Sequence, residues 1–224
     1  MSTSTPAQPS TTNKLLTLPY ELRQRIYVHL LTLLHPVYLF QDPGCPIETF
    51  IPENPPPTGC LYCTPTARSP PKQKHILYSR NCFTVLYPAM QDSLLLLSSF
   101  LGCIGPVNAR SLGHLCIGFP GVEVSSGTEK TLKLRGETMQ RLKVLAGSCA
   151  GLQRVEILIY GGKILSDLKS CSHTSLRRIL AETGAVLRSI ESLATILVRV
   201  YGGVLTAPVR DSLQELGWAV SLGK

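Results

Sequence analysis

Charged and aromatic residues are scarce in this chain of 224 residues, at 16% and 6% of the composition. Hydrophobic residues make up 44%, and this combination excludes a wholly disordered chain and a charged coiled coil. No apolar run approaches the roughly 20 residues of a membrane-spanning helix, so we expect no membrane partner. The first residues also lack the apolar segment of a secretory signal peptide. We therefore expect a cytoplasmic or nuclear protein whose eight cysteines are reduced.

The short motifs of common active sites are also missing. None of the five histidines lies in a His-Glu-x-x-His motif, and no serine lies in Gly-x-Ser-x-Gly. Gly161-Gly162-Lys163 differs from a phosphate-binding loop, because Ile157 stands where the first glycine of that motif is required. We predict a protein that is not an enzyme and has no cofactor.

A candidate metal site lies at Cys60-Leu61-Tyr62-Cys63, whose spacing lets two thiolates share one zinc ion. Cys45 and His75 lie on or beside the same segment. A second closely spaced pair is absent, so we predict no metal ligands and keep a metal-stabilised structural domain as an alternative. Four further cysteines fall in or beside apolar patterns and are predicted to be small core residues: Cys82, Cys103, Cys116 and Cys149.

The distribution of polar, proline and apolar residues divides the chain into four segments. We predict a disordered tail, a helical segment, a proline-rich loop and an α/β domain, at residues 1–13, 14–40, 41–75 and 76–224.

An amphipathic helix is predicted over residues 19–34, where Leu22, Ile26, Leu30 and Leu33 recur at steps of three and four. Pro19 suits the first helical position, and Pro36 cannot continue the helix.

The predicted domain after residue 76 alternates between strands and helices. Strands are expected at residues 82–86, 112–118 and 154–160. Helices are expected at residues 92–104, 136–146, 174–201 and 208–219, the last carrying the only tryptophan. The fold class is therefore mixed α/β with few short strands.

Two hexapeptides, residues 112–117 and 152–157, share one pattern of apolar positions. The pattern resembles the strand of a leucine-rich repeat. Their offset of about 40 residues exceeds the roughly 20–29 of a regular repeat. We therefore predict two βα units lying side by side.

Residues 15–31, LLTLPYELRQRIYVHLL, resemble the opening of an F-box, particularly the F-box-like domains abundant in filamentous fungi. Residues 76–83, ILYSRNCF, look like that family's strand after the box, and residues 104–115 look like its next helix-to-strand junction. A full F-box has three helices, and only the first is evident. The helix that the family carries before its strand is predicted to be missing from residues 64–75.

The resemblance implies a protein-interaction module, an F-box-type substrate adaptor of a ubiquitin ligase. Its first helix would bind the adaptor subunit of a cullin-type ligase, and the α/β domain would hold an unknown protein substrate. The partner-binding residues would be Leu18, Pro19, Leu22, Ile26 and Leu30. Alternatively, the same apolar face packs on the chain's own core.

A basic nucleic-acid or acidic-surface binding protein is the other alternative. Lys and Arg number 22 against 14 Asp and Glu, a net charge of +8. Two clusters hold much of this excess: Arg68, Lys72, Lys74 and Arg80, and then Lys130, Lys133, Arg135, Arg141 and Lys143. Such clusters can bind phosphates, but no nucleic-acid-binding motif accompanies them, so we do not expect nucleic acid.

Overall fold

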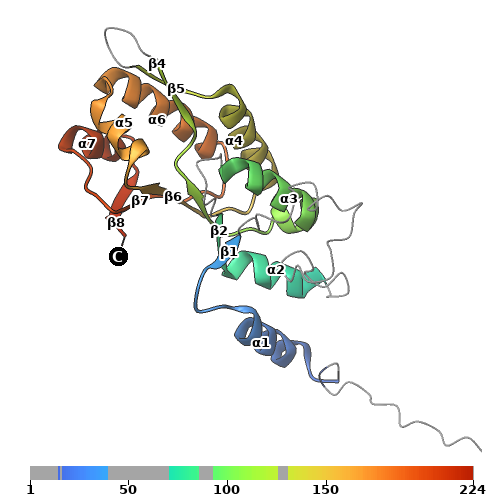
Figure 1. The fold of residues 1–224 in the computed structure, drawn as a ribbon. Helices are drawn as coiled ribbons and strands as arrows, with labels where there is room; N and C mark the ends of the chain where they lie inside the picture. The colour runs from blue at the N-terminus through green and yellow to red at the C-terminus, as the bar shows by residue number, and fades with distance from the viewer. Residues whose placement is uncertain (1–14, 16, 40–70, 86–92, 126–130, 224) are drawn as a thin grey trace, which may run out of the picture.

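A computed structural model describes residues 15, 17–39, 71–85, 93–125 and 131–223 (Figure 1). Over these residues the chain forms a mixed α/β fold with seven helices, a parallel sheet of six strands and a two-stranded antiparallel sheet. This confirms the mixed α/β class that the sequence predicts. The predicted tail and most of the predicted proline-rich loop lie outside the described residues.

The strands of the parallel sheet follow their order in the chain, β1-β2-β3-β6-β7-β8. They are β1 (Val37–Leu39), β2 (Cys82–Val85), β3 (His114–Gly118), β6 (Arg154–Tyr160), β7 (Thr195–Tyr201) and β8 (Ala219–Leu222). The hairpin strands are β4 (Val122–Ser125) and β5 (Thr131–Leu134). The helices are α1 (Tyr20–Leu31), α2 (Pro71–Arg80), α3 (Ser93–Ala109), α4 (Gly136–Ser148), α5 (Lys163–Ser170), α6 (His173–Arg188) and α7 (Ala207–Glu215).

The helices lie along one side of the parallel sheet (Figure 1). Each crossover connection joins two neighbouring parallel strands, and such connections share one handedness. Because the strands are added in one direction across the sheet, the helices of these connections lie on the same face. Successive helices contact each other from α1 through α2, α3, α4 and α6 to α7. Among the described residues no helix covers the other side, which we call the open face.

Alternation along the strands separates core residues from open-face residues. Phe83, Leu115, Val155 and Ile196 occupy aligned positions and are buried toward the helices. Their neighbours along each strand point to the opposite side. The open face therefore carries polar side chains that the sequence places in otherwise apolar strands.

The three predicted strands are confirmed as β2, β3 and β6. The two hexapeptides are confirmed as neighbours, because β3 pairs with β6 in parallel with Ile117 opposite Ile157. Helices are also confirmed at two predicted places, as α3 and α4. Helix α3 was predicted to end at residue 104. The helix breaks at Gly105, whose φ is +75°, and helical structure then continues to Ala109.

The helix predicted over residues 174–201 is wrong in its second half. The chain instead forms α6, a turn, and then β7 parallel to β6. Ser192 Oγ donates to the carbonyls of Ala150 and Leu152, which ties this turn to the start of β6. The β-branched run that follows has Ile196, Val198 and Val200 at alternating positions, and these side chains are buried in the sheet.

Three other segments differ from expectation. Helix α2 covers residues 71–75, which were expected to be loop, and residues 76–80, which were expected to be strand-like. It therefore overlaps residues 64–75, from which the family's helix was predicted to be missing. The polar segment between β3 and α4 contains the hairpin of β4 and β5. The last helix ends at Glu215, and Trp218 lies between it and the unexpected strand β8.

Helix α1 confirms the predicted amphipathic helix but ends at Leu31 rather than Leu34. Asn81 accounts for this end. Its side-chain amide donates to the carbonyls of Leu31 and Leu77 at 2.7 Å each, and its Oδ1 accepts from the Leu33 N–H at 2.6 Å. One buried side chain therefore joins the last turns of α1 and α2. Within the described residues, none of the helices combines the length and the apolar character needed to cross a membrane.

Gly113→Ala is expected to lower the free energy of unfolding by about 1–3 kcal/mol. An added Cβ would lie 2.5 Å from the Ser79 carbonyl oxygen, and backbone must move to relieve that overlap. Urea unfolding followed by circular dichroism measures the change. Gly102→Ala is the matched control, because its Cβ would meet nothing within 4 Å on α3. This control should stabilise by up to about 1 kcal/mol through helix propensity, and equal effects of the two changes would contradict the prediction.

Candidate functional site

The open face gathers six chemically active side chains near the beginnings of β2, β3 and β6 and the middle of β7. The register places Cys82 opposite His114 and His114 opposite Arg154. In the next row, Cys116 lies opposite Glu156. Residues two apart on one strand share a face, so these rows form one cluster. We call it the open-face cluster: Cys82, His114, Cys116, Arg154, Glu156 and Arg199.

Glu156 is the central acceptor of this cluster. Its side chain is only 5% exposed. Arg199 Nε donates to Oε2 at 2.6 Å, and Arg154 Nε donates to Oε1 at 2.9 Å. His114 Nε2 lies 3.0 Å from the same Oε1. Burial by itself raises the pKa of Glu156, but the hydrogen bond from Arg199 and the charges of both arginines outweigh it and lower that pKa.

Cys116 lies opposite this carboxylate on β3, and Cys82 lies beyond it on β2. Cys82 Sγ is 3.3 Å from Cys116 Sγ, and Cys116 Sγ is 3.9 Å from His114 Nε2. The hydrogen bond from Cys116 lowers the pKa of Cys82 despite its burial, and His114 contributes to the shift. The same hydrogen bond raises the pKa of Cys116. Cys82 is therefore the thiol that ionises first.

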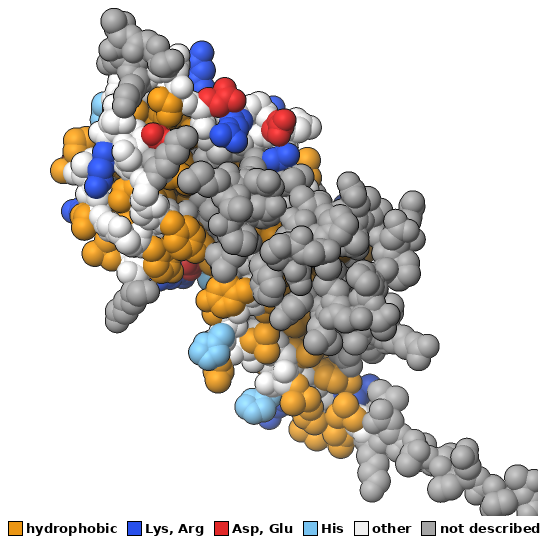
Figure 2. Space-filling view, in the orientation of Figure 1, with side chains coloured by type: hydrophobic (Ala, Val, Ile, Leu, Met, Phe, Trp, Pro, Cys, Tyr) orange, Lys and Arg blue, Asp and Glu red, His pale blue; other side chains and the backbone are white. Residues whose placement is uncertain are grey.

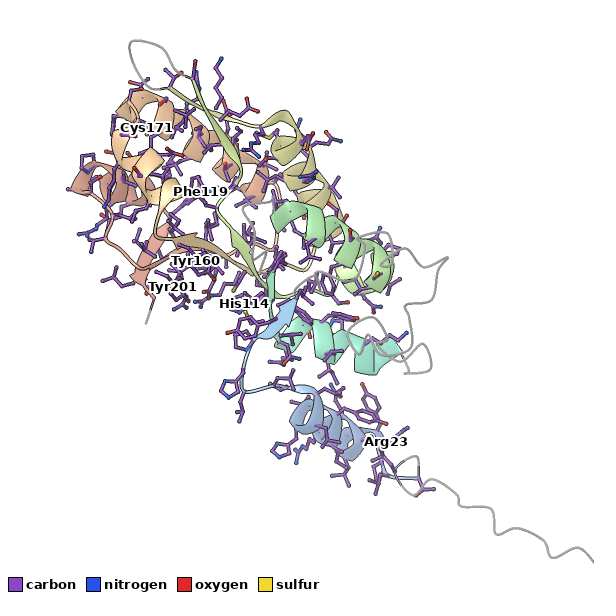
Figure 3. The ribbon with its side chains drawn as sticks, viewed as in Figure 1. Arg23, His114, Phe119, Tyr160, Cys171 and Tyr201 are labelled. Atoms are coloured by element: carbon purple, nitrogen blue, oxygen red, sulfur yellow. The ribbon has the colours of Figure 1, made fainter. Side chains whose placement is uncertain are left out.

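Tyrosines occupy the open face beyond the cluster. Tyr160 and Tyr201 lie opposite each other on β6 and β7, with ring centroids 5.3 Å apart and an angle of 18° between the rings. Figure 3 shows these rings and His114 on the side of the sheet away from α4 and α6. Tyr38 of β1 is also exposed. Flat aromatic rings beside charged groups are typical of surfaces that bind other proteins.

The geometry of His114 differs from that of a catalytic relay in the contacts of its Nε2. A Cys–His–Glu relay needs the two ring nitrogens of the histidine to face different partners. His114 turns Nε2 toward both Glu156 and Cys116. Two arginines around one carboxylate leave the cluster with an excess of positive charge, which suits an acidic ligand.

The predicted partner-binding residues lie on and just before α1, outside the open face. Pro19, Leu22 and Leu30 are exposed, the latter two at 45% and 65%, and Leu18 and Ile26 are half-buried. Every residue of α1 is described, and none is buried. Figure 2 shows hydrophobic side chains gathered over this helix, at the end of the molecule away from α7.

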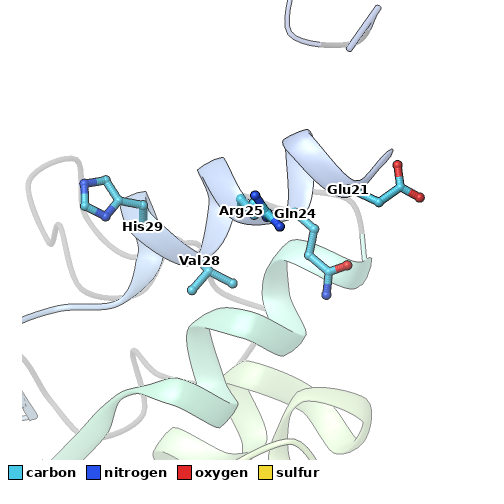
Figure 4. A pocket seen from close by; sticks show the side chains of 5 residues that line it. All are labelled: Glu21, Gln24, Arg25, Val28 and His29. Carbon is cyan, nitrogen blue, oxygen red and sulfur yellow. The ribbon is translucent and has the colours of Figure 1, made fainter. Parts of the chain in front are cut away.

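A hollow of about 520 Å³ lies beside α1 (Figure 4). Its described lining comes from one helix: Glu21, Gln24, Arg25, Val28 and His29. These residues are mostly polar and are not the predicted partner-binding residues. The hollow and the apolar side chains therefore occupy different faces of α1.

The two basic clusters considered from the sequence lie on separate elements. Lys74 and Arg80 belong to α2, whereas Lys133 belongs to β5 and Arg141 to α4, and Figure 1 places α2 and β5 far apart. Arg141 also pairs with Glu137 at 3.2 Å. Arg68 and Lys130 lie outside the described residues. This separation gives no support to a single phosphate-binding surface.

Sequence reasoning missed the open-face cluster. Cys116 and Cys149 are buried as predicted, although Cys116 lies on the open-face side of β3. Cys82 and Cys103, also expected in the core, are half-buried. A signal was present in His114-x-Cys116 and Arg154-x-Glu156, which put polar pairs on one face of two strands predicted to be neighbours. Of the zinc set considered above, His75 is exposed on α2, and Cys45, Cys60 and Cys63 lie outside the described residues.

The fold and this cluster define an α/β protein whose parallel sheet has polar side chains on one face, a face that no helix of the described residues covers. Comparisons with known proteins add nothing to this class, because no family model, no curated protein and no solved structure matches the chain.

Proposed function

We propose that this chain is a protein-interaction module of the F-box substrate-adaptor type. In this proposal α1 binds the adaptor subunit of a cullin-type ubiquitin ligase, and the open face holds a protein substrate. The observation that carries the proposal is that α1 buries none of its residues, although the rest of the chain has an extensive core.

The exposed apolar side chains of α1 have the spacing of a helix that docks in a groove. Leu22, Ile26 and Leu30 stand one turn apart on one face. Helices recognised by a groove present anchors at such spacings. Asn81 joins the end of α1 to α2, and Leu22 and Leu30 stay exposed in that arrangement.

The open face supplies the second binding surface of the proposal. Arg154 and Arg199 are partly exposed, and Tyr160 and Tyr38 are exposed on the same face. Arginine and tyrosine are the residues that most often dominate the energy of protein interfaces. Charge complementarity favours a substrate segment with acidic side chains.

Leu22→Asp combined with Ile26→Asp is expected to weaken binding to the purified adaptor subunit on the order of 100-fold or more, because two anchors would bring charge into an apolar groove. A pull-down followed by a binding titration measures the loss. Circular dichroism should stay unchanged, since neither side chain is buried in the fold.

Val107→Asp is the matched control, since Val107 is 73% exposed on α3 and lies outside the proposed interface. It should bind the adaptor as the unmodified chain does. A folded, unmodified chain that does not bind the adaptor would contradict the proposal. Equal weakening by Val107→Asp would show that the loss is not specific to α1 and would also contradict the proposal.

A further inference from the structure

Three metal-ligating groups converge on the open face without any role in the proposed substrate contacts. The sulfurs of Cys82 and Cys116 and a ring nitrogen of His114 all lie within 4.8 Å of one another. They come from two paired strands, with Cys82 opposite His114 and Cys116 two residues further along β3. We propose that Cys82, His114 and Cys116 bind a zinc ion.

The spacing agrees with tetrahedral zinc. Zinc–sulfur bonds of about 2.3 Å and zinc–nitrogen bonds of about 2.0–2.1 Å place two sulfurs about 3.8 Å apart and sulfur and nitrogen about 3.6 Å apart. The corresponding distances are 3.3 Å between the sulfurs and 3.9 Å between Cys116 Sγ and His114 Nε2. Small side-chain rotations on a fixed pair of strands convert one arrangement into the other.

The donor set selects zinc over the hard cations. Two thiolates and one imidazole are soft or intermediate ligands, whereas magnesium and calcium require oxygen ligands. Zinc at His114 Nε2 replaces the hydrogen bond to Glu156, whose carboxylate keeps its two arginine partners.

Three protein ligands leave one coordination position for water or for a group of a bound protein. This position belongs to the open face, since all three ligands project from it. Cys82 directly follows Asn81, the side chain that holds α1 on α2. Zinc therefore holds the beginning of β2 on β3, next to the point where α1 is attached.

The test measures zinc and cobalt binding to the full chain. Chain produced with zinc in the medium should retain about one zinc ion after gel filtration, measured by elemental mass spectrometry. After chelation, added Co²⁺ should produce the absorption of a thiolate-to-cobalt charge transfer. Cys82→Ser combined with Cys116→Ser should abolish both signals, and His114→Gln should weaken cobalt binding about 10-fold or more.

Cys60→Ser combined with Cys63→Ser is the matched control, because it removes the other pair that the sequence offers to zinc. It should leave zinc content and the cobalt spectrum unchanged. Loss of both signals in this control, with retention in the Cys82 and Cys116 variant, would overturn the proposal. The unmodified chain tests the zinc proposal even if a variant misfolds. Absence of the thiolate-to-cobalt absorption in this chain, or a Cys82–Cys116 disulfide without metal, would also overturn the proposal.

Discussion

Trp218→Ala is expected to lower the free energy of unfolding by about 3–5 kcal/mol, the usual range for removing a buried tryptophan. Trp218 is 2% exposed and belongs to the main core, between α7 and β8. Its ring lies against α6, where a Cβ added to Gly184 would be 3.3 Å from the indole. The substitution therefore leaves a cavity between α6 and the last strand.

Urea unfolding followed by far-ultraviolet circular dichroism measures this loss without using the tryptophan itself. Leu222→Ala is the control, because Leu222 is an exposed side chain on the adjoining strand β8. That change should stay within about 0.5 kcal/mol, as surface substitutions usually do. A loss below about 1 kcal/mol for Trp218→Ala would show that the end of the chain is not part of the cooperative core.

Asn81→Ala is expected to destabilise the chain by about 2–4 kcal/mol, because it removes three hydrogen bonds made by one buried side chain. The carbonyls of Leu31 and Leu77 and the N–H of Leu33 lose their partner together. None of the residues of α1 is buried, and Asn81 joins its last turn to that of α2 by hydrogen bonds. We therefore expect the substitution to release α1.

Hydrogen exchange tests this release region by region. Amides of α1 should lose protection in Asn81→Ala, while amides of β6 and β7 should keep theirs. Asn81→Asp is an informative comparison, because it retains the acceptor for Leu33 but loses both donations. It should be destabilised as well. Unchanged exchange in α1 with either substitution would mean that other contacts hold the helix.

Strong local signals made several elements predictable from sequence. Strand β6 matches its expected bounds because a β-branched and apolar run ends at Gly161-Gly162, which cannot continue the strand pattern. Helix α4 starts at its expected residue. In both elements the apolar residues repeat with a single period, and residues that interrupt this pattern mark one end of the element.

Ambiguous periodicity explains the main error. Apolar residues from Leu176 to Val200 satisfy a helical stripe, but Ile196, Val198 and Val200 satisfy a strand equally well. A neighbouring parallel strand, β6, decides between them by pairing with Thr195–Tyr201 residue by residue. Local propensity yields to this pairing because it buries both strands in one sheet.

The sequence by itself determined the alternating α/β pattern and the amphipathic face of α1, since each depends on residues close together in the chain. It also indicated that β3 and β6 are neighbours, because their two hexapeptides share one pattern of apolar positions. Only the tertiary structure decided that Cys82, His114 and Glu156 meet. The two cysteines are 34 residues apart, and His114 and Glu156 are 42 residues apart. Contacts over such separations are not determined by local sequence patterns. Strand register brings them together, and register is set by how the opposite faces of those strands pack against the helices.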